Sequence, residues 1–238
     1  ETDDGKIHFV RSSIPFTCNV KTRAAETLRF ENKVFENEFT AKAIRHAVTS
    51  PDGKTLVFNA GGVLWKKSMP AGAPVRIDGL PYFTPEDPAS KAQRADYYLE
   101  SEPSFSPDGK TIVYAGWNDE MKGGIFTNDL TKNQYGILWT KEKQIYRTPS
   151  FSPDGKQIVF RKQSGDDELG PGMTDKPGIY VIDADGKNER FVTVDGENPR
   201  FSPDGKRIYV STGGALFGGL WGLVSSVADA AFEAVTGK

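Results

Sequence analysis

A five-residue phrase, Ser-Pro-Asp-Gly-Lys, occurs four times in this chain and constrains its fold more than any other feature. The copies begin at Ser50, Ser106, Ser152 and Ser202, so successive copies stand 56, 46 and 50 residues apart. Each copy is followed by a short run of β-prone residues, of which Ile158-Val159-Phe160 is typical. A period of roughly 40–50 residues indicates one supersecondary unit that is repeated in space.

The phrase itself predicts a β-hairpin. Proline fixes φ at the first turn position, aspartate hydrogen-bonds to nearby backbone, and glycine accepts a positive φ. A second hairpin follows within the unit: in the third repeat we expect strands at 178–183 and 189–193, joined by a turn at 184–187. Four short antiparallel strands per unit are typical of a propeller blade, so we predict an all-β propeller.

A degenerate copy of the unit stands at the start of the chain. Asp4 to Val10 match the turn and the second strand of the unit, but no Ser-Pro and no earlier strand precede them. With the four full phrases, this copy predicts about five blades, of which the first and the last are incomplete. We therefore assign residues 1–212 to the propeller and residues 213–238 to an apolar tail.

The tail does not follow the repeat, and three interpretations of it stay open. The 21 residues from Ile208 to Ala228 carry no charge. The segment could supply the last two strands of the final blade, form an apolar helix that plugs the ring or docks on a partner, or enter a membrane. Self-association through an exposed tail is a further expectation. The residues predicted for such an interface are Leu216, Phe217, Leu220, Trp221 and Val224.

Composition limits the classes of function. The net charge is −2 and no run of Lys and Arg occurs, which argues against a nucleic-acid partner. Cys18 is the single cysteine, so no intrachain disulfide is possible. The only histidines are His8 and His46, and no His-x-His pair exists, whereas a metallohydrolase centre needs several such ligands. We predict no catalytic residue, no metal site and no cofactor on this chain.

Two segments carry candidate binding residues. The acidic insertion at 163–176 contains Asp166, Asp167 and Glu168, which could bind a cation or a basic partner. A solvated loop is the alternative for this insertion. Trp117 and Asp119 belong to a polar strand end that could line the centre of the propeller, and a bulge or a turn is the alternative there.

The phrase and its surroundings resemble the repeats of TolB-type propellers, also called WD-like or PD-type repeats. The resemblance covers about Ala43 to Tyr209 and is carried best by residues 102–114 and 178–186. Residues 44–58, with Gly62-Val63-Leu64-Trp65, are more narrowly similar to the N-terminal propeller of bacterial amidohydrolase-family proteins. Ile14-Pro15-Phe16 and residues 197–201 fit the same family.

This resemblance implies a propeller that accompanies a metal-dependent hydrolase barrel, in the periplasm or outside the cell. No such barrel lies in this sequence. We therefore predict a non-catalytic binding or scaffolding module with a protein partner, whose loops on one face recognise a hydrolase domain. The alternatives are an assembly protein that self-associates or attaches to a membrane through its tail, and a metal-dependent hydrolase that acts at the propeller face near Asp166.

Overall fold

The computed structural model of the chain describes residues 6–11, 14–19, 22, 25–27, 44–77, 99–118, 122–139, 144–163 and 176–211. The described residues form five antiparallel sheets and no helix. The strands of the first three sheets are β1 (Lys6–Arg11), β2 (Ile14–Asn19) and β3 (Ala25–Thr27); β4 (Arg45–Thr49), β5 (Thr55–Ala60), β6 (Val63–Ser68) and β7 (Val75–Arg76); and β8 (Leu99–Phe105), β9 (Thr111–Asn118), β10 (Lys122–Asp129) and β11 (Gln134–Trp139). Those of the last two are β12 (Ile145–Phe151), β13 (Gln157–Gln163), β14 (Gly178–Asp183) and β15 (Arg190–Thr193); and β16 (Glu197–Phe201) and β17 (Ile208–Ser211).

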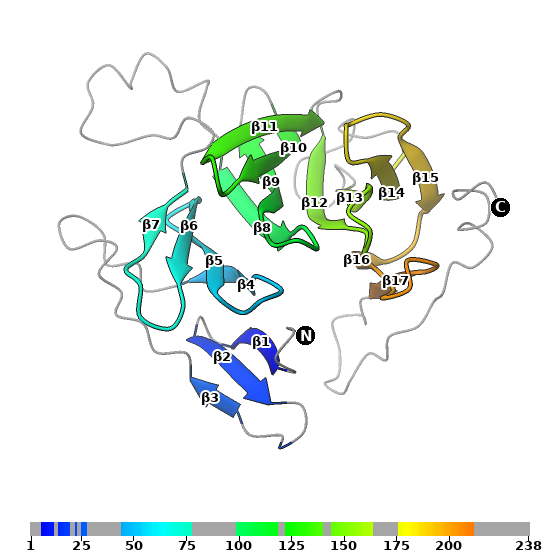
Figure 1. Cartoon of the computed structure of the whole chain (residues 1–238). Helices are drawn as coiled ribbons and strands as arrows, with labels where there is room; N and C mark the ends of the chain where they lie inside the picture. The colour runs from blue at the N-terminus through cyan, green and yellow to red at the C-terminus, as the bar shows by residue number, and fades with distance from the viewer. Residues whose placement is uncertain are drawn as a thin grey trace, which may run out of the picture.

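The five sheets follow one another in chain order around a common centre (Figure 1). In the second to fifth sheets the first strand lies nearest that centre, and these inner strands are β4, β8, β12 and β16. The strands β4, β8 and β12 each contact the inner strand of the next sheet. The predicted all-β propeller is therefore confirmed, and each sheet is a blade. The described residues of the first blade form three strands, in line with the degenerate repeat at the start of the chain, and those of the fifth blade form two.

The repeated phrase forms the turn between the inner strand and the second strand of each blade. In the fourth blade, Ser152 N donates to Gln157 O at 2.8 Å and Gly155 N donates to Ser152 O at 2.9 Å. Gly155 has a φ of 72°, which a residue with a Cβ rarely adopts. The Ser152 hydroxyl also donates to Asp154 Oδ1 at 2.6 Å, and the other three copies repeat this contact. The predicted hairpins are thus confirmed.

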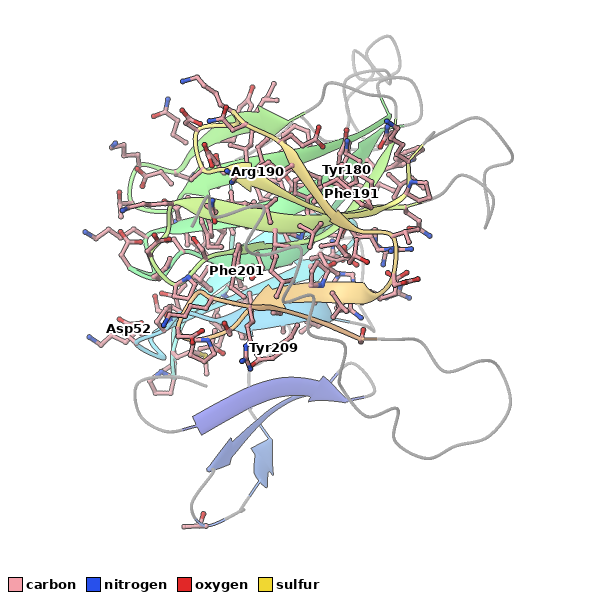
Figure 2. All side chains as sticks on the ribbon, turned by 90° about the vertical axis from the view of Figure 1, so that its right-hand side faces the viewer. Asp52, Tyr180, Arg190, Phe191, Phe201 and Tyr209 are labelled. Atoms are coloured by element: carbon pink, nitrogen blue, oxygen red, sulfur yellow. The ribbon has the colours of Figure 1, made fainter. Side chains whose placement is uncertain are left out.

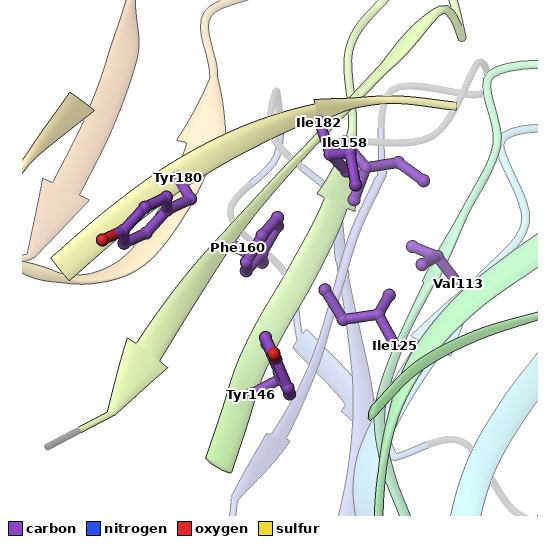
Figure 3. Packing of buried hydrophobic residues seen from close by; sticks show 7 residues of the cluster. All are labelled: Val113, Ile125, Tyr146, Ile158, Phe160, Tyr180 and Ile182. Carbon is purple, nitrogen blue, oxygen red and sulfur yellow. The ribbon is translucent and has the colours of Figure 1, made fainter. Parts of the chain in front are cut away.

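The apolar run after each phrase is buried on both sides because a blade is covered by a neighbour on each face. In the fourth blade, Ile158 and Phe160 pack toward the third blade with Val113 and Ile125 (Figure 3). Val159 points the opposite way and packs against Ile208 and Val210 of the fifth blade. Alternate side chains of one strand therefore join the two adjoining blades, which makes the blades a rigid frame.

The turns of successive blades also rest on one another. A Cβ placed on Gly109 would lie 3.4 Å from Cδ of Pro51 in the preceding turn. Gly155 and Pro107 repeat this arrangement, as do Gly205 and Pro153, with separations of 3.6 and 3.7 Å. From the second phrase onward, the glycine thus packs against the proline of the phrase before it, and the four turns form a continuous row.

No helix in the described part of the chain has the length and apolar character that crossing a bilayer requires.

Candidate ligand site on the inner strands

Each of the four inner strands is interrupted by a β-bulge at the same position, four residues before the serine of the phrase. The pairing register shifts there in every blade. The residues at this position are His46, Glu102, Thr148 and Asn198, and their φ angles lie between 49° and 54°. A left-handed backbone at a residue other than glycine is strained, and bulges of this kind re-aim the side chains beside them.

Sequence reasoning missed these bulges although the chain carries a signal for them. Proline follows the bulged residue in three of the four blades, at Pro103, Pro149 and Pro199. A proline inside a strand is confined to edges, strand starts and bulges because it has no N–H to donate. The position of these prolines within strands that pair on one side could have predicted the irregularity, but not the contacts that it creates.

Glu102 lies at the centre of the polar groups that the bulges bring together. Its two carboxylate oxygens accept hydrogen bonds from Arg147 Nε at 2.9 and 3.0 Å, and one of them also accepts from Arg147 Nη2 at 2.6 Å. It also accepts the backbone N–H of Thr148 at 2.7 Å. The side chain of Glu102 is 8% exposed and that of Arg147 is 44% exposed, so the carboxylate is buried while the arginine stays partly open to solvent. Gln163 Oε1 accepts from Arg147 Nη1 at 3.2 Å and fixes the group further.

Thr148 connects this pair to the fifth blade. Its carbonyl oxygen accepts Arg200 Nη1 at 3.1 Å, and Pro199 O accepts the same nitrogen at 2.8 Å. The Thr148 hydroxyl is buried and has no hydrogen-bond partner among the described residues. Loss of hydration lowers the pKa of Arg200, while the negative charge of Glu102 acts in the opposite direction. Glu102 and Arg200 are therefore near enough to influence one another.

His46 extends the group to the second blade. Its Nδ1 accepts the backbone N–H of Glu102 at 3.4 Å, which requires the neutral form at that nitrogen. Desolvation lowers the pKa of His46 below its ordinary value of 6.5. Glu102 acts to raise this pKa, and the positive charges of Arg147 and Arg45 act to lower it. The four blades thus contribute to one electrostatic group, which we call the inner-strand cluster. Its members are Arg45, His46, Glu102, Arg147, Thr148 and Arg200.

A second polar surface lies at the end of the molecule that carries the phrase turns, where Figure 2 shows Asp52. Two grooves with volumes of about 810 and 470 Å³ open between neighbouring turns there. The larger groove is lined by Asp154, Asp183, Asp185 and Arg190. These carboxylates already have partners: Ser152 and the Lys156 N–H for Asp154, Arg190 and Asn188 for Asp183, and Lys187 for Asp185. The grooves therefore present fixed charge rather than a reactive group.

The predicted site residues mostly fall outside the part of the chain that the structure describes. Asp119, Asp166, Asp167 and Glu168 lie outside the described residues, and so do the tail residues Leu216, Phe217, Leu220, Trp221 and Val224. Trp117 lies in β9, where it is paired with Leu99 of β8 and Gly123 of β10. The strand continues to Asn118, and the choice between a strand end that lines the centre and a bulge or turn at Asp119 lies outside the described residues.

The inner-strand cluster has the chemistry of a binding site for charge. Its functional groups are three guanidinium groups, one carboxylate, one imidazole and one hydroxyl. Nucleophilic catalysis needs a hydroxyl that is hydrogen-bonded to a base, and the Thr148 hydroxyl makes no such bond within the described residues. No group of three or more His, Cys, Asp or Glu side chains that could hold a metal ion occurs among the residues described.

Comparisons with known proteins agree with the fold. No protein-family model and no curated protein matches the sequence. Among solved structures, a protein assigned as TolB from Agrobacterium tumefaciens is similar with a TM-score of 0.62 and 17% identity, over 90% of this chain and 68% of that one. TolB from Acinetobacter baumannii has a TM-score of 0.59 and 18% identity, over 90% of this chain and 48% of that one. An oligogalacturonate lyase in complex with manganese has a TM-score of 0.57 and 16% identity, over 87% of this chain and 55% of that one.

These likenesses establish a shared fold. The chain spans about two thirds of the first of these proteins and about half of the second. The solved structures that resemble this chain are thus TolB-like and related β-propellers.

Proposed function

We propose that this chain is a non-catalytic propeller module that binds a protein partner and holds it in position. The observation that carries the proposal is the left-handed, non-glycine residue that recurs at one position of four inner strands. Each such conformation costs of the order of 1–3 kcal/mol, and strain of this kind collects at functional sites. An unbulged strand would pair with its neighbour equally well, so pairing alone gives no reason for the bulges.

Binding is favoured over catalysis by the groups that surround the bulges. Arg147, Glu102 and Gln163 hold one another in place, so their positions are set before any ligand arrives. Preorganised charged groups on a rigid frame suit recognition because little side-chain freedom is lost on binding. Propeller frames also carry several turns on one face, and loops positioned by a scaffold commonly hold binding residues.

The finer part of the proposal concerns the partner. The sequence resemblance favours a metal-dependent hydrolase of the amidohydrolase type, whose access or assembly the propeller would control. It also favours a periplasmic or extracellular location. These assignments rest on the similarity of residues 14–16, 44–58, 62–65 and 197–201 to the propellers of that family.

The test combines the purified chain with an amidohydrolase barrel that has been separated from its own propeller. We expect a stable complex in light scattering and a change in the kcat/KM of the barrel toward large substrates but not small ones. The chain alone, supplied with Zn²⁺ or Mn²⁺, should not hydrolyse amides or esters. Arg147→Gln should weaken the complex, whereas Lys132→Gln, which removes an exposed charge from an outer turn, should not.

Two results would contradict these statements separately. Sustained metal-dependent turnover by the chain alone would overturn the non-catalytic assignment. No complex with the barrel, together with an unchanged kcat/KM for every substrate, would overturn the hydrolase partner.

A further inference from the structure

The inner-strand cluster carries an excess of positive charge. Arg147 and Arg200 act on the carboxylate of Glu102, and Arg45 acts on His46, whose Nδ1 accepts the N–H of Glu102 and is therefore neutral. The cluster therefore has two more positive than negative charges, although the whole chain carries a net charge of −2. A local excess of positive charge attracts a negatively charged ligand even when the net charge of the whole chain is negative.

The donors of two arginines in the cluster are open. Arg45 is exposed and has no hydrogen-bond or ion-pair partner among the described residues. Arg200 uses Nη1 for two carbonyl oxygens, and the described residues provide no partner for its Nε and Nη2. A guanidinium group presents its N–H donors as a planar fork, which matches a carboxylate with two parallel hydrogen bonds. Thr148 contacts Glu102 and Arg200 through its backbone, and its buried hydroxyl has no partner either among these residues.

The arrangement of these groups favours single carboxylates over a compact dianion. Arg45 lies on β4 and Arg200 on β16, at the two ends of the row of inner strands, with Glu102 between them on β8. A dianion placed between the arginines would meet the negative charge of Glu102 more strongly than a carboxylate would. An extended segment that carries separate carboxylates fits such a row.

From this arrangement we infer that the inner-strand cluster binds carboxylate groups of an extended, acidic peptide segment of the partner, through the guanidinium groups of Arg45 and Arg200. The inference rests on the proposed binding function and specifies the ligand. Arg147 is a positioning residue for this site, since Glu102 and Gln163 occupy its fork and it contributes mainly charge.

The experiment measures binding of synthetic peptides to the full chain by titration calorimetry, at about 20 mM and about 200 mM salt. The first peptide is an acetylated, amidated hexapeptide of alternating Gly and Glu, so all of its carboxylates are side chains. The second alternates Gly and Gln and has a free carboxyl terminus. The third is its neutral amide, and inorganic phosphate serves as a compact anion.

We expect the acidic peptide to bind and the neutral amide not to bind, with weaker binding at the higher salt concentration. Arg45→Gln should weaken binding about tenfold, which corresponds to the loss of one charge-assisted hydrogen bond. Arg45 has no partner in the described structure, so this variant should fold normally. Lys54→Gln removes a charge from a side chain that is 81% exposed in a phrase turn and should leave binding unchanged.

The free-acid peptide identifies the source of the carboxylate. If it binds as tightly as the acidic peptide, the site recognises a chain terminus, and if it binds much more weakly, the site recognises acidic side chains. Both results support carboxylate recognition. Equal binding of the neutral amide, tighter binding of phosphate, or no effect of Arg45→Gln would overturn it. Those outcomes would overturn carboxylate recognition but not the proposed function, which is tested separately by the complex with the hydrolase barrel.

Discussion

At the scale of single residues, the serine of the repeated phrase organises its turn. The Ser152 hydroxyl donates to Asp154 Oδ1 at 2.6 Å and accepts the backbone N–H of Gln157 at 2.9 Å. The hydrogen bond from Ser152, followed by that from the Lys156 N–H, holds the pKa of Asp154 below its ordinary value of 3.8. A small buried hydroxyl thus fixes both an exposed carboxylate and the first residue of the next strand.

Replacing this serine tests that role. Ser152→Ala should lower the free energy of unfolding by about 1–2 kcal/mol, because two hydrogen bonds are lost and the Gln157 N–H is left without its acceptor. The pKa of Asp154 should rise toward 3.8. Urea unfolding and a carboxyl carbon NMR titration measure the two effects. Ser68→Ala, at an exposed serine, is the matched control and should change neither.

The direction of the pH dependence follows from the same pKa. A carboxylate whose pKa is lower in the folded than in the unfolded chain stabilises the fold above about pH 3.8, and this contribution is lost as the pH falls through the folded value. The Ser152→Ala variant should therefore lose less stability in acid than the parent chain does. An equal acid dependence of the two would contradict the assigned cause.

His46 reports on the charges of the inner-strand cluster. Its pKa lies below 6.5, so it favours the folded chain in full above about pH 6.5, and this contribution is lost as the pH falls through the folded value. Arg45→Gln should raise the pKa of His46, since Arg45 is one of the charges that lower it. A proton NMR titration of the imidazole measures this, and His46→Asn assigns the signal.

Lys54→Gln again supplies the control for that titration, because Lys54 lies in the phrase turn and does not affect His46. A pKa of His46 that is unchanged in Arg45→Gln would show that the two side chains are farther apart than the inner-strand cluster requires.

At the scale of strands, the third and fourth blades approach each other closely at a glycine. Gly123 of β10 lies against the segment that leads into β12, and a Cβ placed on it would lie 2.0 Å from the backbone oxygen of Gln144. Backbone of the next blade therefore occupies the space that any larger residue would need. Such a position differs from a turn glycine, whose role is conformational.

Two glycine substitutions separate these roles. Gly123→Ala should cost about 3 kcal/mol or more of unfolding free energy, because the third and fourth blades must move apart. Gly53→Ala should cost about 1–2 kcal/mol, because nothing lies near its Cβ position and only the left-handed backbone, with a φ of 71°, is strained. Thermal and urea unfolding of both variants measure the difference, and equal losses would contradict the close approach.

The strand scale also separates what the sequence could predict from what it could not. The phrase turns and the second hairpin of each repeat are local, and turn chemistry with alternating apolar residues was enough to place them. The contact between Glu102 and Arg147 joins residues 45 positions apart on different blades. Glu102 begins one of the segments that carry the TolB resemblance, but no local pattern pairs it with Arg147, so only the packing of β8 beside β12 could bring the two together. The bulges had a local signal in their prolines, but its meaning depended on the neighbouring blade.

At the scale of the whole molecule, the stability of the propeller is a sum over the interfaces between neighbouring blades. The second to fifth blades pack against one another in chain order, as the separate core clusters between successive blades indicate. Such arrays gain stability from each interface in turn rather than from one central core. The inner-strand cluster depends on this arrangement because its members come from four consecutive blades.

The tail belongs to this scale as a prediction from sequence. The full chain should have the mass of two or more chains in light scattering, whereas a chain that ends at Ser211 should have the mass of one, because an uncharged segment of this length favours self-association if it is exposed. Both should be compared at the same concentration. The mass of a single chain for both would contradict self-association through Leu216, Phe217, Leu220, Trp221 and Val224.

The row of phrase turns has a consequence for how such a chain changes in evolution. Each of the two middle turns has a glycine that packs against the proline of the turn before it and a proline that packs against the glycine of the turn after it. A duplicated unit therefore brings a proline and a glycine that fit the turns on either side of it. After a deletion, the two turns that become neighbours fit each other in the same way. The number of units can change by whole steps without a compensating substitution at the new junction, whereas the charged side chains on the inner strands can diverge one unit at a time.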